Sequence, residues 1–281
     1  MNNCLILDGK EVAQASIENL LVRVKKLRDF GRAPKLVAIL VGDDPASATY
    51  VNMKERACHT LGIKTEIKRL AKDTDTFELQ QIINDLNNDK TVDGILLQHP
   101  VPKQIDEIKC FNTISLEKDV DGVTTEGFGN MAMGLNAFGS CTPLGIMRIL
   151  NHYKINLEGT NALVIGRSQI LGKPMAAMLL NANATVTIAH SKTNNLRNSL
   201  KGFDLVVVAV GVPNFISAKD LKVGSILIDA GYHPAQKCGD VDMTNISNIV
   251  SAYTPVPGGV GPMTINTLMM NTIEAMEKKY E

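Results

Sequence analysis

The sequence predicts an α/β protein built from two domains, and two observations lead to this prediction. Apolar runs of about five residues alternate with helix-period segments along most of the chain, which is typical of parallel α/β folds. The chain has 281 residues, a length that suits two modest domains better than one oversized core. We therefore expect two α/β domains that join between residues 120 and 145.

The first half of the chain predicts three strands and two helices. Strand-sized apolar runs lie at 36–41, 64–70 and 94–98, and segments of helical period lie at 47–61 and 77–87. The run at 94–98 stops at His99-Pro100-Val101-Pro102, where two prolines break any regular pattern. The order is the strand–helix alternation of a parallel sheet.

The second half begins a new strand–helix series. Cys141-Thr142-Pro143 opens a helix at 144–151, and strands are expected at 162–165, 185–189, 205–210, 226–229 and 249–253. Segment 254–262 is rich in proline and glycine and predicts an irregular loop. A terminal helix is expected at 264–278.

Composition excludes several classes of protein. Hydrophobic residues make up 44% and charged residues 21%, and 29 basic residues balance 29 acidic ones, which argues against nucleic acid or an anionic membrane as the main partner. The longest apolar runs are strand-sized, and residues 1–10 lack the features of an export signal. The five cysteines are scattered and form no CxxC pair, so we expect reduced thiols in the cytoplasm and neither disulfides nor a zinc site.

Residues 162–174 predict a nucleotide-binding turn between a strand and a helix. Gly166 and Gly172 flank the turn, where glycine lets a pyrophosphate approach backbone N–H groups at a helix N-terminus. The segment departs from G-x-G-x-x-G because the second glycine is missing and the loop is longer. An ordinary strand–loop–helix of a doubly wound sheet explains it equally well.

The end of the next strand favours NADP over NAD. NAD-binding sheets usually place an acid there to accept from the adenosine ribose, but this strand ends in His190-Ser191-Lys192-Thr193. Arg167, Ser191 and Lys192 could hold a 2′-phosphate, because guanidinium and hydroxyl groups suit its oxygens. Lys192 could also be a solvated loop charge.

Four residues of the first half are candidates for the chemical site. Tyr50 and Lys54 are four apart in a helical segment and share a face, just after the end of a strand. Gln98 ends an apolar strand and needs a hydrogen-bond partner if it is buried. Asp121 lies in a polar turn. Each also has an ordinary interpretation as a solvated lysine, a packed tyrosine or a turn residue, and the histidines lack the spacing of metal ligands.

Eight motifs occur in order and together resemble one family. They are Tyr50-Val51-x-x-Lys54-x-x-Ala57-Cys58, Leu96-Leu97-Gln98-x-Pro100, Lys118-Asp119-Val120-Asp121-Gly122, Cys141-Thr142-Pro143-x-Gly145, Gly166-Arg167-Ser168-x-x-x-Gly172-Lys173-Pro174, His190-Ser191-x-Thr193, Gly239-Asp240-Val241 and Thr254-Pro255-Val256-Pro257-Gly258-Gly259-Val260-Gly261-Pro262-Met263-Thr264. The set resembles the bifunctional methylenetetrahydrofolate dehydrogenase/methenyltetrahydrofolate cyclohydrolase family over nearly the whole chain.

The resemblance implies an architecture and an activity. It implies an N-terminal α/β folate domain at 1–120, completed by the C-terminal helix at 264–281, and a C-terminal Rossmann-type NADP-binding domain at 140–263, with a cleft between them. It implies oxidation of 5,10-methylenetetrahydrofolate with NADP and hydrolysis of the product to 10-formyltetrahydrofolate. A homodimer is the implied assembly, and tetrahydrofolate derivatives are the implied substrates.

The resemblance also implies roles for individual residues. The catalytic lysine of the family matches Lys54, its partner glutamine matches Gln98, the stacking tyrosine matches Tyr50 and the pterin-binding aspartate matches Asp121. Cofactor contacts fall on Gly166, Arg167, Ser168, Ser191 and Tyr232. Substrate contacts include the loop residues Pro257, Gly258 and Gly259.

The chain departs from the family pattern at two places. Val123-Thr124-Thr125 replaces a common Phe-His-Pro beside the expected folate, and Ala230-Gly231-Tyr232-His233 replaces a common Val-Gly-Ile-Asn near the expected nicotinamide ribose. Three rival functions remain open at this point: a family member with dehydrogenase activity only, an NADP dehydrogenase of a small oxo-acid, and a folate- or nucleotide-binding regulator without turnover.

Overall fold

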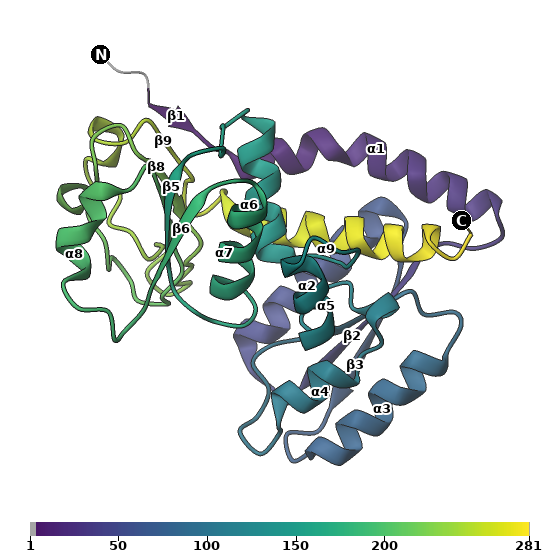
Figure 1. Cartoon of the computed structure of the whole chain (residues 1–281). Coiled ribbons are helices and arrows are strands. Elements are labelled where there is room, and N and C mark those ends of the chain that lie inside the picture. The colour runs from purple at the N-terminus through teal and green to yellow at the C-terminus, as the bar shows by residue number, and fades with distance from the viewer. Residues whose placement is uncertain (1–3, 281) are drawn as a thin grey trace. The chain divides into compact units, whose positions relative to one another are not determined.

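The computed structural model describes residues 4–280 and divides into two compact units (Figure 1). One unit comprises residues 1–14 and 142–264, and the other comprises 15–141 and 265–281. We name them the six-stranded unit and the three-stranded unit after their sheets. Residues 1–14 belong with 142–264, because their strand pairs in parallel with the last strand of the six-stranded sheet. The sequence boundaries instead assigned these residues to the folate domain.

The six-stranded unit contains a fully parallel sheet in the order β1-β9-β8-β7-β5-β6. Its strands are β1 (Leu5–Ile6), β5 (Asn161–Ile165), β6 (Thr185–Ala189), β7 (Leu205–Val208), β8 (Ile226–Asp229) and β9 (Ala252–Tyr253). The chain proceeds from β5 to β6 on one side, and then returns to add β7 and β8 on the other. Such a reversal is where open parallel sheets bind ligands, outside the carboxyl ends of their strands.

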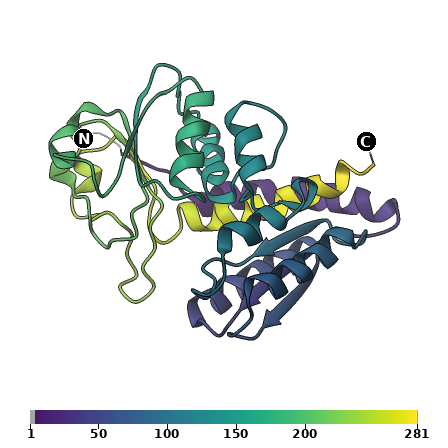
Figure 2. The same cartoon turned by 60° about the horizontal axis from the view of Figure 1, so that its bottom comes forward.

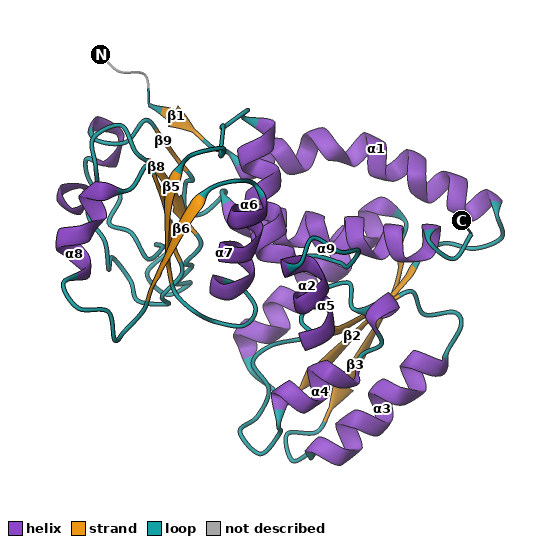
Figure 3. Ribbon diagram, viewed as in Figure 1, coloured by secondary structure: helices purple, strands orange, loops and turns teal. Residues whose placement is uncertain are grey.

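Helices and short turns connect these strands (Figure 3). They are α6 (Cys141–His152), α7 (Gly172–Asn181), α8 (Leu196–Ser199) and the 3₁₀ turns η2 (Leu200–Gly202), η3 (Ala218–Asp220) and η4 (Ile246–Asn248). One side of the sheet buries an apolar cluster around Leu163, Val206 and Leu227. These inward side chains are the continuous Val, Leu and Ile runs expected of a parallel sheet that is covered on both faces.

The three-stranded unit contains a parallel sheet in the order β3-β2-β4. Its elements are β2 (Lys35–Val41), α2 (Pro45–Leu61), β3 (Lys64–Leu70), α3 (Thr76–Asn88), β4 (Gly94–Leu97), α4 (Glu107–Thr113), η1 (Leu116–Lys118) and α5 (Thr125–Ala132). Helix α2 begins cleanly because the Asp44 side chain accepts from Ser47 N at 2.7 Å and Pro45 occupies the first turn. It ends at Gly62, whose φ of 73° is the left-handed conformation that favours glycine.

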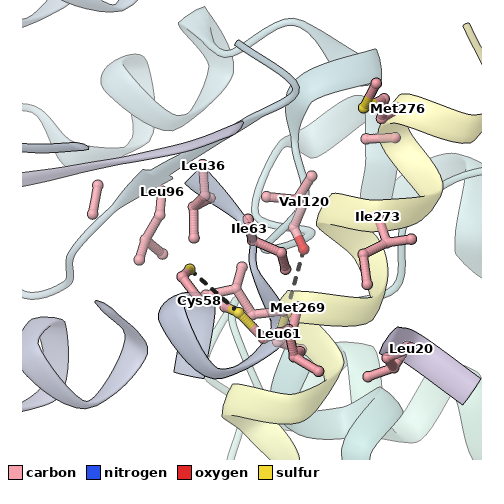
Figure 4. Close-up of a cluster of buried hydrophobic side chains, with 14 of the residues drawn as sticks. Leu20, Leu36, Cys58, Leu61, Ile63, Leu96, Val120, Met269, Ile273 and Met276 are labelled. Atoms are coloured by element: carbon pink, nitrogen blue, oxygen red, sulfur yellow. Dashed lines mark hydrogen bonds between the residues drawn. The ribbon is translucent and has the colours of Figure 1, made fainter. Parts of the chain in front are cut away.

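Two long helices complete the three-stranded unit, α1 (Gly9–Asp29) and α9 (Val260–Glu277). They lie side by side (Figures 1 and 2), with Ser16 Oγ 3.0 Å from Asn266 Oδ1 and Arg23 Nε 2.9 Å from Glu277 Oε1. Figure 4 shows the core that they share with α2 and the sheet, where the Cys58 thiol donates to the thioether sulfur of Met269 at 3.4 Å.

Strands 64–70, 185–189 and 226–229 have the bounds expected from the sequence, and the other expected elements differ from theirs by a few residues at one or both ends. Helix α1 was not expected. The strand expected at 249–253 is shorter in the structure, where β9 covers only Ala252–Tyr253. Helix α9 begins at Val260, inside the segment expected to be irregular, because Pro262 falls in its first turn, where a missing N–H costs no hydrogen bond. No helix within residues 4–280 is long and apolar enough to cross a membrane.

Candidate active site

Lys54 and Gln98 meet at the carboxyl edge of the three-stranded sheet. Lys54 lies on α2, which follows β2, and Gln98 directly follows β4, the parallel neighbour of β2. The backbone N–H of Gln98 extends the ladder by donating to Ile39 O at 2.9 Å. Lys54 Nζ donates to Gln98 Oε1 at 3.0 Å, and the two residues are only 9% and 8% exposed. Lys54 and Gln98, which the sequence analysis expected to be partners, are therefore in direct contact.

The turn after β4 fixes the orientation of the Gln98 amide. Its Nε2 donates to His99 O at 2.7 Å, which leaves Oε1 as the atom that faces Lys54. His99 is held in turn, because its Nδ1 lies 2.7 Å from Glu107 Oε1, and the same oxygen accepts from Val101 N at 3.3 Å. The Glu107 carboxylate raises the pKa of His99, chiefly through this hydrogen bond. The glutamine is thus positioned from both sides.

Asp121 and Tyr50 are more accessible than this pair. Tyr50 lies one turn before Lys54 on α2 and is 36% exposed. Asp121 is half-buried in the turn after η1, where the neighbouring Asp119 is 1% exposed and accepts from the N–H groups of Val123 and Thr124. Of the two acids in this turn, Asp119 closes the turn. Asp121 does not close the turn in this way, and its side chain interacts with the Cys141 thiol.

The pKa of the Cys141 thiol depends on its burial and on charged side chains near it. Burial raises its pKa well above the usual value and Asp121 raises it further, whereas Lys54 acts in the opposite direction. Asp121 and Lys54 therefore both act on the same buried thiol, which is 2% exposed. The structure brings Lys54, Gln98 and Asp121 into one region of the three-stranded unit.

The glycine turn after β5 has the close packing that a nucleotide loop requires. Gly166 has a φ of 135°, and a Cβ there would lie 2.3 Å from Ala209 O on the neighbouring strand end. A Cβ on Gly172, the first residue of α7, would lie 2.4 Å from Gly166 O. Since no side chain fits at either position, the main chain of this loop can approach a ligand closely, while the first N–H groups of α7 are already bonded within the loop, such as Lys173 N to Ser168 O at 3.0 Å.

The polar residues expected to hold the cofactor lie on loops at one edge of the six-stranded sheet. Arg167 and Ser168 follow β5, Ser191 follows β6, and all three are exposed. Ser168 Oγ accepts from Gly172 N at 3.3 Å. Within residues 4–280, no hydrogen bond or ion pair joins the Arg167 guanidinium to another residue. That leaves the guanidinium available for an anionic ligand.

Tyr232 and the loop after β9 lie in the same unit. Tyr232 follows β8 and is 45% exposed. The loop residues Gly258 and Gly259 pack against the start of α1, where Lys10 N donates to Gly258 O at 3.1 Å. A Cβ on Gly9 would lie only 1.8 Å from Gly259 O. The expected substrate loop is thus fixed by residues near the start of the chain, for which the sequence analysis expected no helix or strand and no role at this loop.

Sequence reasoning also missed two buried acids in the six-stranded unit. Asp229 ends β8, Asp240 follows eleven residues later, and they are 1% and 0% exposed. Burial raises the pKa of Asp229 to about 6. An apolar strand that ends in an acid was the available signal, because a buried carboxylate requires partners.

One cavity is separate from these residues. It has a volume of about 790 Å³ and lies at the amino ends of β2 and β3, with Arg32, Lys35 and Lys64 in its wall. Arg32 is paired with Asp93 and Lys35 with Glu66, so these two charges in the wall have partners. It contains none of the expected site residues. Within residues 4–280, no group of three or more His, Cys, Asp or Glu side chains could hold a metal ion.

Comparison with known proteins covers almost the whole chain. The catalytic domain of tetrahydrofolate dehydrogenase/cyclohydrolase matches residues 7–121, and the NAD(P)-binding domain of the same family matches residues 140–280. The bifunctional protein FolD of Alcanivorax borkumensis is 55% identical over 277 residues, which is 98% of each chain.

Solved structures agree with this match. The FolD methylenetetrahydrofolate dehydrogenase/cyclohydrolase of Campylobacter jejuni has a TM-score of 0.96 at 42% identity, over 98% of this chain and 99% of that one. The Trypanosoma brucei enzyme, solved with NADP and an inhibitor, has a TM-score of 0.94 at 30% identity over 100% of both chains. Because the family models and these relatives span both units, the chain belongs to the tetrahydrofolate dehydrogenase/cyclohydrolase family.

Proposed function

We propose that this chain oxidises 5,10-methylenetetrahydrofolate to 5,10-methenyltetrahydrofolate with NADP, and then hydrolyses that product to 10-formyltetrahydrofolate. The observation that carries the proposal is the buried Lys54–Gln98 hydrogen bond within the matched catalytic domain. A lysine amine that a glutamine oxygen holds at 3.0 Å in an almost solvent-free position is preorganised for proton transfer. A regulator without turnover would have no need of such a pair.

Residues in the six-stranded unit fit NADP. The glycine turn at Gly166 and Gly172 lets the pyrophosphate approach the main chain closely, and Arg167 offers a guanidinium to the 2′-phosphate, with Ser168 and Ser191 as hydroxyl donors. No acid stands at the end of β6 to favour NAD. When bound, NADP supplies the acceptor for the hydride that leaves the folate.

The residues proposed for the hydrolytic step lie in the three-stranded unit. Oxidation leaves a cationic carbon that water attacks, so one proton must leave the water and another must reach a ring nitrogen. Lys54 moves these protons, and Gln98 keeps its amine in place. Asp121 accepts from the amino and N3–H groups of the pterin, and Tyr50 stacks on the folate.

A family member with dehydrogenase activity only is the second candidate. A coupled spectroscopic assay distinguishes the two functions: methylenetetrahydrofolate and NADP are mixed, and the absorbances of NADPH and methenyltetrahydrofolate are followed together. The bifunctional proposal expects NADPH to accumulate while the methenyl absorbance rises only transiently. If the methenyl absorbance decays only at the rate of spontaneous hydrolysis, the chain has dehydrogenase activity only.

The proposal includes a homodimer in the cytoplasm. β6 is the edge strand of its sheet, and Ile188 on β6 and Leu180 on α7 are 43% and 61% exposed. An exposed apolar edge is a surface that a second copy of the chain can cover. All five cysteines are free thiols, as suits a reducing compartment. Sedimentation of the purified protein checks the assembly.

A further inference from the structure

Two buried acids in the six-stranded unit have no part in the proposed chemistry. Asp229 and Asp240 are 1% and 0% exposed, and they lie at the carboxyl edge of the sheet, where the cofactor loops begin. A buried carboxylate is tolerated only when hydrogen bonds replace its lost hydration. The donors that each acid uses therefore indicate which segments it holds.

Asp229 ties two segments of backbone together. Its Oδ1 accepts from Gly231 N at 2.9 Å and from Asp240 N at 3.0 Å, and its Oδ2 accepts from Val241 N at 3.0 Å. Its own N–H donates to Thr254 Oγ1 at 2.8 Å. Through Asp229, the loop after β8 is thus joined to residues 240–241 by main-chain donors.

Asp240 continues the network toward the neighbouring strand. Its Oδ2 accepts from Val210 N at 2.6 Å and from Gly211 N at 2.9 Å, both in the loop after β7. Its Oδ1 lies 2.9 Å from His233 Nε2, and the histidine must be the donor because the carboxylate oxygen accepts. His233 is the only side chain, among the described residues, that donates to Asp240.

The packing leaves no room for this network to relax. A Cβ on Gly231 would lie 2.3 Å from Asp240 Oδ1, and a Cβ on Gly239 would lie 2.0 Å from Asp229 Oδ2. Both glycines are required because the carboxylates fill the space that a side chain would take. Tyr232 lies between Gly231 and His233, so both of its chain neighbours are fixed while its own side chain is 45% exposed.

We propose that Asp240 and His233 are positioning residues for the cofactor, holding the loops after β7 and β8 so that Tyr232 and the backbone at 210–211 are in place before NADP binds. The inference rests on the proposed function, in which this unit binds NADP, and on Tyr232 as an expected cofactor contact. It explains the departure of this chain from the common Val-Gly-Ile-Asn, because His233 supplies the donor to Asp240 that an asparagine amide could supply elsewhere.

The test compares His233→Leu, which removes the donor, with His233→Gln, whose Nε2–H₂ keeps a donor at a similar reach. NADP affinity is measured by isothermal titration calorimetry, and hydrogen exchange is measured on the unliganded protein. We expect His233→Leu to weaken NADP by about tenfold, as for an unpaired buried acceptor. Exchange at Val210, Gly211 and Gly231 should accelerate, folate KM should stay unchanged, and His233→Gln should bind NADP within about twofold of the parent.

Asp220→Asn is the matched control, because Asp220 is a 7% exposed acid of the same unit whose carboxylate bonds Ser217 and Arg197 rather than His233, Val210 or Gly211. It should lower thermal stability without changing NADP affinity. If His233→Leu does not fold, Asp240→Asn takes its place, and it should weaken NADP while Asp220→Asn does not. Parent-like NADP affinity in the donor-less variant, or equal weakening by Asp220→Asn, overturns the inference. A parent that does not bind NADP contradicts the proposed function instead.

Discussion

Lys54 and Gln98 in the three-stranded unit are buried side chains that hold each other, whereas Arg167, Ser191 and Tyr232 in the six-stranded unit are exposed side chains on loops. The first pair is 9% and 8% exposed and joined by a 3.0 Å hydrogen bond. Around the second group, the rigid parts are backbone turns and the buried carboxylates Asp229 and Asp240. The proposed chemical site is thus held by a contact between two of its own side chains, and the loops of the proposed cofactor site are held by buried carboxylates that accept from main-chain N–H groups.

The difference follows from what each site has to do. Proton transfer depends on the position and environment of one amine, so the amine is enclosed and oriented by a neighbour. A dinucleotide instead offers phosphates that backbone N–H groups and long basic side chains can meet on arrival. Substitutions in the chemical site should therefore change turnover, and those in the cofactor loops should change affinity.

The largest effect is expected from Lys54→Met, which removes the amine while keeping much of the side-chain bulk. Cyclohydrolase activity should fall by about 10²–10⁴-fold, the usual contribution of general acid–base catalysis, while part of the dehydrogenase activity remains. Methenyltetrahydrofolate should accumulate in the coupled assay. Gln98→Ala should produce a milder form of the same imbalance, and Arg56→Met, an exposed cation on the same helix, should change neither rate. Hydrolysis at the parent rate in Lys54→Met would remove the lysine from the mechanism.

Asp121→Ala tests whether the chemical site also binds through a side chain. A pterin edge left without its acceptor should cost about 1–3 kcal/mol, which is a rise in folate KM of about 5- to 150-fold. NADP affinity should be unchanged, because Asp121 lies in the three-stranded unit and the expected NADP residues lie in the other. Steady-state kinetics with each substrate varied in turn measure both values. An unchanged folate KM would return Asp121 to the status of a turn residue like Asp119.

Arg167→Ala applies the comparison to the cofactor loops. A charge-assisted contact with the 2′-phosphate contributes about 1.5–3 kcal/mol, so NADP should weaken by about 10- to 150-fold while NAD changes little. Calorimetric titration with both cofactors gives the ratio. Lys192→Ala separates the two interpretations of that lysine, since a solvated charge would leave the ratio unchanged. Equal losses for NADP and NAD would mean that Arg167 does not contact the 2′-phosphate.

The sequence could predict features that depend on local spacing. Lys54 lies four residues after Tyr50 on one helix, and Gln98 ends an apolar strand, so both fell at the carboxyl edge of a parallel sheet. The helical period of α1 is also present, because Val12, Leu20 and Val24 are buried on one face. The spacing of these apolar residues therefore predicts helix α1 from the sequence alone.

Other features depend on contacts that no local pattern encodes. Asp240 accepts from N–H groups at Val210 and Gly211, about thirty residues away along the chain, and main-chain donors carry no sequence signature. Gly9 packs directly against Gly259, although the two residues lie near opposite ends of the sequence. The motif Gly239-Asp240-Val241 was visible in the sequence, but its role became clear only when the strands were placed side by side.

The smallest effect is expected at the outer support of Gln98, where Glu107 holds His99. The hydrogen bond from His99 Nδ1 to Glu107 raises the pKa of His99 above its ordinary value of 6.5, so the folded state keeps the proton to higher pH than the unfolded state. The stabilisation is therefore fully present below that value and is lost as pH rises through the raised pKa. Glu107→Gln should lower the melting temperature more at about pH 6 than at about pH 8, and by only a little, since His99 is 47% exposed and solvent screens the pair. The double variant His99→Gln/Glu107→Gln is the control, because the pH-dependent part of the Glu107 effect should vanish once His99 cannot titrate. A loss of stability that is the same at both pH values would show that Glu107 acts only through its contact with Val101 N, and that the support of Gln98 does not depend on the charge of His99.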